Sequence, residues 1–172
     1  MKVLVVGDAC EDVYVYGHCD RLAPEAPVPV FVKDKEKRNG GMALNVYENL
    51  RSLGVECDIL HNKKHIEKTR YVEEKTNHIF IRIDSDESDI KRIDKKYLTK
   101  KYLSQYDAVV ISDYNKGYVT YDFVQNLRKK FHGPIFIDSK KSDLAKFKGC
   151  IVKINRDEWN KRTSEGDDTY II

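Results

Sequence analysis

The sequence has few cysteines and prolines, and it has no long hydrophobic run. Its four cysteines (positions 10, 19, 57 and 150) form no Cys-x-x-Cys pair. This spacing argues against a zinc ribbon and indicates free thiols in a reducing compartment. Every uncharged apolar run is far shorter than the roughly 20 residues of a membrane span. Residues 1–7 are too short for a secretory signal and lack a cleavage site. We therefore expect a soluble, cytoplasmic protein.

An excess of charge of one sign is also lacking. The chain carries 31 Lys and Arg against 28 Asp and Glu, a formal net charge of +3, and the two signs are interleaved. Its densest basic stretch, residues 91–101, contains Asp94 and has the pattern of a solvated helix face. No aromatic-stacking motif and no recognition helix accompanies it. We therefore expect neither a nucleic-acid partner nor a membrane partner.

Length and composition fit one folded domain. The 172 residues are 41% hydrophobic and 34% charged, which excludes a disordered tail, a collagen-like chain and a disulfide knot. No internal repeat or low-complexity stretch interrupts the chain. We expect a single domain over residues 1–172.

Short β-branched runs alternate with amphipathic segments along most of the chain. The patterns predict strands over residues 2–6, 55–60, 108–111, 135–137 and 151–154. They predict helices over residues 40–54, opened by Gly40-Gly41 and ended by Gly54, over 94–105, capped by Asp94, and over 120–131, capped by Thr120. This alternation is typical of βαβ units, and it predicts an α/β fold: a three-layer α/β/α sandwich around a mostly parallel sheet.

Two regions break the alternation and predict a small β lid, at about residues 13–37 and 68–84. Three of the four prolines lie in residues 21–32, so this segment is neither a helix nor a central strand. The alternating valines predict an edge strand over residues 28–32. Residues 69–84 have the pattern of a hairpin that turns near Thr76-Asn77.

Polar residues follow the predicted parallel strands. Asp8, Asp113, Asp138 and Asn155 each come at a strand end, and ligands of open parallel sheets bind beyond the carboxyl ends of strands. Any one of them alone fits a helix cap or a turn. Together they suggest a ligand, because converging carboxylates repel one another. Gly40-Gly41 at the start of a helix adds bare backbone N–H groups suited to an oxygen-rich ligand.

A series of motifs occurs in a characteristic order. It comprises Gly7-Asp8 with Asp12, the proline-rich residues 21–30, Gly-Gly-x-x-x-Asn at 40–45, Ser-Asp-Tyr-x-Lys-Gly at 112–117, Ile-Asp-x-Lys at 137–140 and Asn-x-x-Glu at 155–158. This series resembles the ribokinase (PfkB) carbohydrate kinase family. Within it, the chain is most similar to heptose 7-phosphate kinase domains of ADP-heptose synthesis. The resemblance covers residues 1 to about 160.

The resemblance implies a ribokinase-like fold and ATP-dependent phosphoryl transfer, with magnesium, to a sugar such as heptose 7-phosphate. It implies a homodimer formed through the β lid. Residues at the matching substrate-binding positions are Asp8, Asp12, Arg21, Gly40, Gly41, Asn45, Asp113 and Lys116. Residues matching the positions that organise phosphate and magnesium are Asp138, Lys140, Asn155 and Glu158. No direct metal ligand is expected.

The sequence also departs from the family. Residues 60–69 are too few for the usual crossover helix, and Lys153-Ile154 replaces the usual Thr-Pro. The family's Gly-Ala-Gly-Asp motif, which supplies the anion hole and the catalytic base, is missing. Residues 166–169 resemble it only superficially, with Asp168 as a weak candidate base. We therefore expect a truncated fold that binds sugar but transfers phosphate poorly by itself. The alternative is a non-catalytic sugar-binding or dimerising module, and a purely structural domain is the weakest interpretation.

Overall fold

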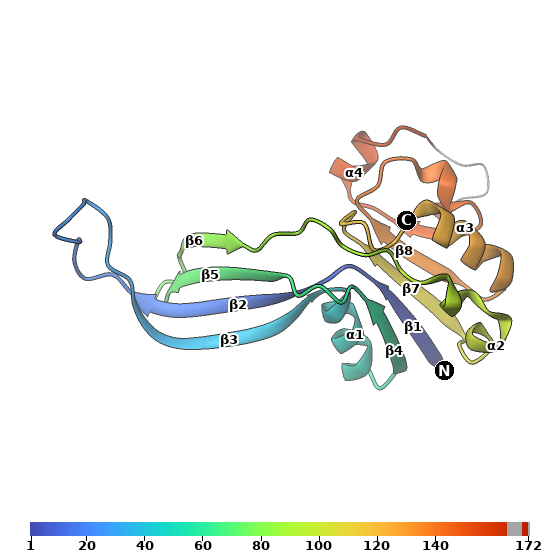
Figure 1. Ribbon diagram of the computed structural model, residues 1–172, viewed down its shortest axis with the longest axis horizontal. Coiled ribbons are helices and arrows are strands. Elements are labelled where there is room, and N and C mark those ends of the chain that lie inside the picture. Colours follow the sequence, from blue (N-terminus) through green and yellow to red (C-terminus); the bar gives the residue numbers. More distant parts are fainter. Residues whose placement is uncertain (165–169, 172) are drawn as a thin grey trace. The chain divides into compact units, whose positions relative to one another are not determined.

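A computed structural model describes residues 1–164 and 170–171 of the chain (Figure 1). The chain divides into two compact units. Unit 1 comprises Met1–Ala9, Met42–Lys64 and Glu87–Ile172, and unit 2 comprises Cys10–Gly41 and His65–Asp86. Both predicted lid segments fall inside unit 2. The assignment of the whole chain to one ribokinase-like domain stays a prediction.

Unit 1 is built on a six-stranded sheet in the order β10-β9-β8-β7-β1-β4. Every pairing between these strands is parallel, as the βαβ pattern predicts. The strands are β1 (Lys2–Gly7), β4 (Glu56–His61), β7 (Ala108–Asp113), β8 (Ile135–Ser139), β9 (Ile151–Lys153) and β10 (Tyr170–Ile171). The predicted α/β class with a mostly parallel sheet is confirmed.

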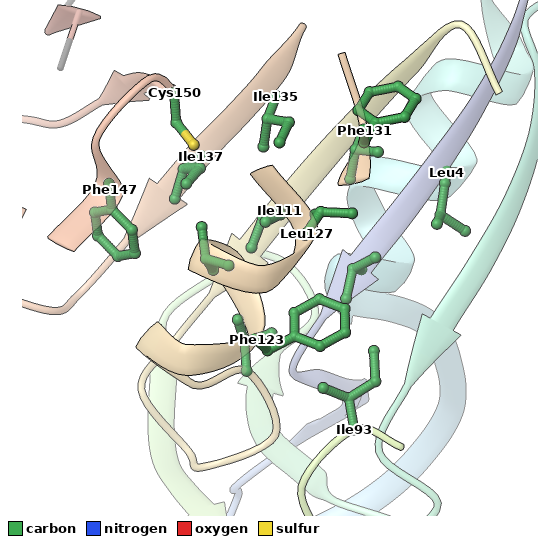
Figure 2. Packing of buried hydrophobic residues seen from close by; sticks show 14 of the residues in the cluster. Leu4, Ile93, Ile111, Phe123, Leu127, Phe131, Ile135, Ile137, Phe147 and Cys150 are labelled. Atoms are coloured by element: carbon green, nitrogen blue, oxygen red, sulfur yellow. The ribbon is translucent and has the colours of Figure 1, made fainter. Parts of the chain in front are cut away.

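Helices cover both faces of this sheet. On one face, Leu4 of β1 packs in a large cluster with Phe123 and Leu127 of α3 (Tyr121–Lys130), as Figure 2 shows. Successive strand residues point to opposite faces, so the buried Val3 and Val5 lie on the other face, where α1 (Ala43–Ser52) contacts β1 and β4. The remaining helical segments are short: η1 (Lys95–Leu98), α2 (Lys100–Leu103), η2 (Leu144–Phe147) and α4 (Arg156–Asn160).

Helix ends follow the sequence signals closely in two cases. The Thr120 side chain accepts a hydrogen bond from the N–H of Phe123, as expected of an N-cap. Gly54 (φ +77°) ends α1 with a Schellman motif: its N–H donates to Arg51 O and the N–H of Val55 donates to Leu50 O.

Two helix predictions need correction. The predicted helix 94–105 is divided, because Thr99 is extended and its side chain caps α2, while Asp94 caps the preceding 3-10 turn. Gly40 and Gly41 do not open a helix, because they lie at the end of a strand and α1 begins at Ala43. None of the helices among residues 1–164 is long and apolar enough to span a bilayer.

Unit 2 is built on a four-stranded sheet in the order β3-β2-β5-β6. Its strands are β2 (Ala9–His18), β3 (Val32–Met42), β5 (Glu67–Glu73) and β6 (Ile79–Asp84). Strand β5 pairs parallel with β2 and antiparallel with β6. The predicted hairpin is confirmed, with Asn77 in the left-handed region (φ 58°) at its turn.

The predicted edge strand over residues 28–32 is wrong, because β3 begins only at Val32. The proline-rich segment before it makes one isolated bridge, between Leu22 and Pro29. Prolines lack the N–H that a ladder needs, so the strand starts after the last of them. The residues of β3 are mostly charged and exposed, and several of their side chains form ion pairs, such as Lys35 with Glu74. Such a strand has no apolar alternation for a sequence pattern to detect.

Candidate functional site

Asp8 lies directly after β1, where its side chain is fully buried. Both carboxylate oxygens accept backbone hydrogen bonds from the loop after β7. Oδ2 accepts from Tyr114 N (2.8 Å) and Lys116 N (3.1 Å), and Oδ1 accepts from Tyr118 N (3.3 Å). This loop includes Gly117 at φ +104°, a conformation that favours glycine. Asp8 therefore fixes the course of the Ser-Asp-Tyr-x-Lys-Gly motif.

Burial raises the pKa of Asp8 above the usual value of 3.8. The three backbone N–H groups oppose this effect, and the nearby carboxylate of Asp113 adds to it. The strand-end pattern predicts a ligand-facing Asp8, but the structure buries this side chain within unit 1. Its carboxylate positions the loop after β7.

Asp113, at the end of β7, is the centre of a second buried polar group. Lys141 Nζ lies 2.6 and 2.7 Å from its two carboxylate oxygens, and Ser139 Oγ donates to it over 2.7 Å. Lys141 Nζ also donates to Val119 O. The side chain of Lys141 is 10% exposed and that of Asp113 is 1% exposed. Strand β7, strand β8 and the segment after β8 therefore meet through one buried ion pair.

A pocket of about 360 Å³ opens beside this ion pair, beyond the carboxyl ends of β8 and β9. It is lined by Lys140, Lys141, Ser142, Asn155, Asp157, Glu158 and Lys161. Three lysines and two carboxylates line its wall, and two of the lysines, Lys140 and Lys141, are engaged in ion pairs. The structure thus brings together three of the four residues expected to organise phosphate and magnesium.

Asn155 and Glu158 also have a local structural role. They form a capping box at α4: Asn155 Oδ1 accepts from Glu158 N and Glu158 Oε2 accepts from Asn155 N, both over 2.9 Å. The other oxygen of Glu158 pairs with Lys140, and although burial opposes it, this pairing helps to lower the pKa of Glu158. The Asn-x-x-Glu motif therefore fixes α4 and the Lys140 ammonium at the pocket wall.

The other predicted residues of unit 1 lie apart from the pocket lining. Asp138 is about half exposed and pairs with Lys153 over 3.0 Å. Lys116 pairs with Glu87, and Asn45 is exposed in the first turn of α1.

Unit 2 holds the remaining predicted residues. A Cβ added at Gly41 would lie 2.4 Å from Asp12 Oδ2 and 2.5 Å from Cys10 Sγ, so only glycine allows this close approach. Asp12 Oδ1 accepts from Arg70 Nη1 over 2.6 Å. Gly40 precedes Gly41 in β3, whereas Arg21 is exposed in the proline-rich loop. Asp12 and Gly41 are thus neighbours, as one site would require.

Sequence reasoning missed two residues of these groups, Lys141 and Arg70. Lys141 follows the motif lysine Lys140, and nothing in the pattern tells which of the two turns inward. Arg70 could not be assigned to Asp12, because the pairing of β2 with β5 that brings them together is not given by the sequence pattern. The superficial motif at residues 166–169, with Asp168, lies outside the described residues.

Comparison with known proteins finds relatives that are similar in amino-acid sequence. No family profile matches the chain. It is 35% identical over 193 residues to the bifunctional protein HldE of Helicobacter pylori (strain G27), an alignment that covers 91% of this chain and 42% of that protein. The chain therefore spans less than half the length of the curated relatives it matches.

Solved structures with the same fold are sugar kinases. Phosphofructokinase-2 of Escherichia coli, in complex with fructose-6-phosphate, matches with a TM-score of 0.54 and 11% identity, over 96% of this chain and 66% of that one. Ribokinase of Arabidopsis thaliana, complexed with ribose and ATP, matches with a TM-score of 0.52 and 11% identity. The match covers 94% of this chain and 62% of that one. At this identity the likeness establishes the fold.

Proposed function

Because the chain is related in sequence to the bifunctional HldE proteins and has the fold of the ribokinase-like carbohydrate kinases, we propose that it binds a sugar phosphate as part of a sugar kinase. The acceptor is a sugar such as heptose 7-phosphate, and ATP is the phosphoryl donor. Asp12 and Gly41, which lie side by side in unit 2, would contact the sugar hydroxyls.

The lysine-lined pocket is the observation that carries this proposal. Lys140 and Lys161 line a cavity beyond the carboxyl ends of the parallel strands β8 and β9. Ligands of open parallel sheets usually bind at this end of the strands. The buried pair with Asp113 holds Lys141, one of the lining residues, in place. Phosphoryl transfer depends mainly on positioning and on neutralising charge, and the pocket lysines, two of them held by ion pairs, would serve both.

The residues present also fit magnesium. Mg²⁺ prefers oxygen ligands, and Asp157 and Glu158 line the same pocket as the lysines. Both Glu158 oxygens are already engaged, by Lys140 and by Asn155 N, so we propose that Glu158 organises the site rather than binding the ion directly. When bound, magnesium would neutralise phosphate charge.

We propose that this chain alone transfers phosphate poorly. Its 172 residues contain no Gly-Ala-Gly-Asp motif, and loss of a single oxyanion donor already lowers a rate by about 10²–10³. The alternative is a sugar-binding module without catalysis. Calorimetry with heptose 7-phosphate and fructose 6-phosphate tests binding, and an ADP-release assay tests transfer. Binding without ADP release is expected, and robust turnover would overturn the statement about catalysis.

A matched pair of variants tests the sugar site. Asp12→Asn should weaken sugar phosphate binding at least tenfold, whereas Asp20→Asn, at an exposed aspartate of the same unit, should leave it unchanged. Equal affinities of the two variants would remove Asp12 from the site. Absence of any sugar phosphate binding by the wild-type chain would overturn the proposed function itself.

A dimerising role is favoured by one further observation. Strand β6 is at the edge of its sheet, and its Ile79, Ile81 and Ile83 are each about half exposed. An apolar edge strand invites pairing with another chain. We propose a homodimer through this strand. Light scattering at increasing concentration should show a dimer that Ile81→Lys converts to a monomer, and a wild-type monomer at high concentration would contradict the proposal.

A further inference from the structure

Unit 2 carries a histidine and two glutamates that converge on one face of its sheet. Glu11 of β2 is paired in register with Glu67 of β5, and Glu11 N donates to Ile66 O over 2.8 Å. His65 precedes β5, and its imidazole lies close to the carboxylates of both Glu11 and Glu67. The backbone thus holds three ligand-type side chains on one patch.

The distances within this patch suit a small cation. His65 Nε2 lies 3.7 Å from Glu11 Oε2 and 3.8 Å from Glu67 Oε2, and the three ligand atoms all lie within 4.8 Å of one another. Ligands about 2.1 Å from a zinc ion are roughly 3.4 Å apart in tetrahedral geometry. Side-chain rotation that brings these three atoms closer together would complete a three-ligand site with one position open to water.

Arg38 of β3 now holds the two glutamates together. Its Nη1 donates to Glu11 Oε2 (2.8 Å) and to Glu67 Oε2 (3.1 Å). A cation bound by the same oxygens must displace this guanidinium group. The displaced group has another partner, because Arg38 Nε already donates to Glu36 over 2.6 Å. Until a cation binds, Arg38 screens the repulsion between the carboxylates and keeps the ligands close.

We propose that Glu11, His65 and Glu67 form a site for a zinc-class divalent cation, for which Arg38 competes. One imidazole and two carboxylates suit Zn²⁺ or Co²⁺. Mg²⁺ and Ca²⁺ prefer oxygen ligands, and Ca²⁺ takes more of them than this patch offers. The bound ion would join neighbouring strands β2 and β5 and release β3 from its bridge to them. This site is independent of the proposed sugar binding.

Calorimetry of the untagged chain with ZnCl₂ tests the site, with Co²⁺ and its visible absorption as a second probe. We expect one equivalent of Zn²⁺ to bind and Mg²⁺ to give no heat. His65→Ala and Glu67→Gln should each weaken binding at least tenfold, while His78→Ala, at an exposed histidine of the same unit, should not. Arg38→Gln should tighten binding several-fold, because the competing cation is gone.

Circular dichroism checks that each variant is folded. If Arg38→Gln does not fold, the contrast between His65→Ala and His78→Ala decides the question. If His65→Ala binds zinc as tightly as the wild type, the proposed site is wrong. If a folded Arg38→Gln variant binds zinc no more tightly than the wild type, Arg38 does not compete with the ion. Sugar phosphate binding measured in His65→Ala should stay at the wild-type level, so failure of the metal site and failure of the proposed function are distinguishable.

Discussion

Lys141 Nζ lies within 2.7 Å of both carboxylate oxygens of Asp113, and neither side chain is more than 10% exposed. Removal of one partner from a buried ion pair leaves an uncompensated charge, which costs about 3–5 kcal/mol. We therefore expect Lys141→Met to lower the free energy of unfolding by about that amount, measured by urea denaturation.

Two controls accompany this measurement. Lys153→Met breaks the exposed pair with Asp138 and should leave stability nearly unchanged, because exposed pairs contribute little. The double variant Lys141→Met with Asp113→Asn removes both charges and should recover part of the loss. If Lys141→Met is as stable as Lys153→Met, the buried pair does not hold these strands together.

The second prediction concerns Asp8. Asp8→Asn replaces a carboxylate that accepts three backbone N–H bonds with an amide that can accept at only one atom. Leaving buried donors unpaired costs about 1–3 kcal/mol, so the variant should be less stable by that amount while the β1–β7 register persists. Hydrogen exchange of the Tyr114, Lys116 and Tyr118 amides should accelerate in the variant, and unchanged protection would contradict the loop-holding role.

A pH dependence follows from the raised pKa of Asp8. The folded protein holds this proton to a higher pH than the unfolded chain, whose value is near 3.8. Between those two values the folded state binds more protons, so the contribution of Asp8 to stability falls as pH rises. The stability difference between the wild type and Asp8→Asn should narrow from about pH 4 upward. A difference that widens with pH would mean a lowered pKa instead.

Sequence patterns predicted best those elements whose burial determines their residues. The run of residues 2–6 is buried on both faces of a parallel sheet, and only an apolar β-branched strand fits there. Thr120 caps α3 because a hydroxyl at that position has one backbone partner within reach. Strand β3 could not be predicted, because its charged side chains are exposed and form ion pairs with residues far away in the sequence.

Prediction of the candidate site was limited in a similar way. The strand-end rule located Asp8 and Asp113 correctly, but both turned out to be buried and engaged by the protein itself rather than open to a ligand. Whether a carboxylate is saturated depends on the course of a loop such as 114–118, which a linear pattern does not give. Lys141 was missed because the direction of a side chain after a strand end is set by packing.

Reactivity of the cysteines gives the next prediction. Burial raises the pKa of Cys150 to about 11, and the thiolate is the reactive form. Maleimide at about pH 8 should therefore leave Cys150 and the buried Cys10 unmodified while it labels the partly exposed Cys19. Mass spectrometry of digested protein gives the sites. Labelling of all four thiols in urea is the control, and rapid native labelling of Cys150 would contradict its burial.

The last prediction concerns the effect of a side chain at Gly41 on the proposed sugar site. In Gly41→Ala the new Cβ would lie 2.4 Å from Asp12 Oδ2 and 2.5 Å from Cys10 Sγ, so the Asp12 carboxylate, which Arg70 binds, must shift. Overpacking of this kind costs about 1–3 kcal/mol. If Asp12 contacts the sugar, the displacement should also weaken sugar phosphate binding at least tenfold in calorimetry.

Gly54→Ala is the matched control for this effect. Gly54 has φ +77° but nothing within 4 Å of its Cβ position, so alanine there strains the backbone by about 1–2 kcal/mol without moving a neighbour. Both variants should therefore lose stability, measured by urea denaturation, but only Gly41→Ala should lose affinity. Equal affinity in the two variants would show that the close approach of Gly41 to Asp12 serves packing alone, because a displaced carboxylate that contacts the ligand cannot leave binding unchanged.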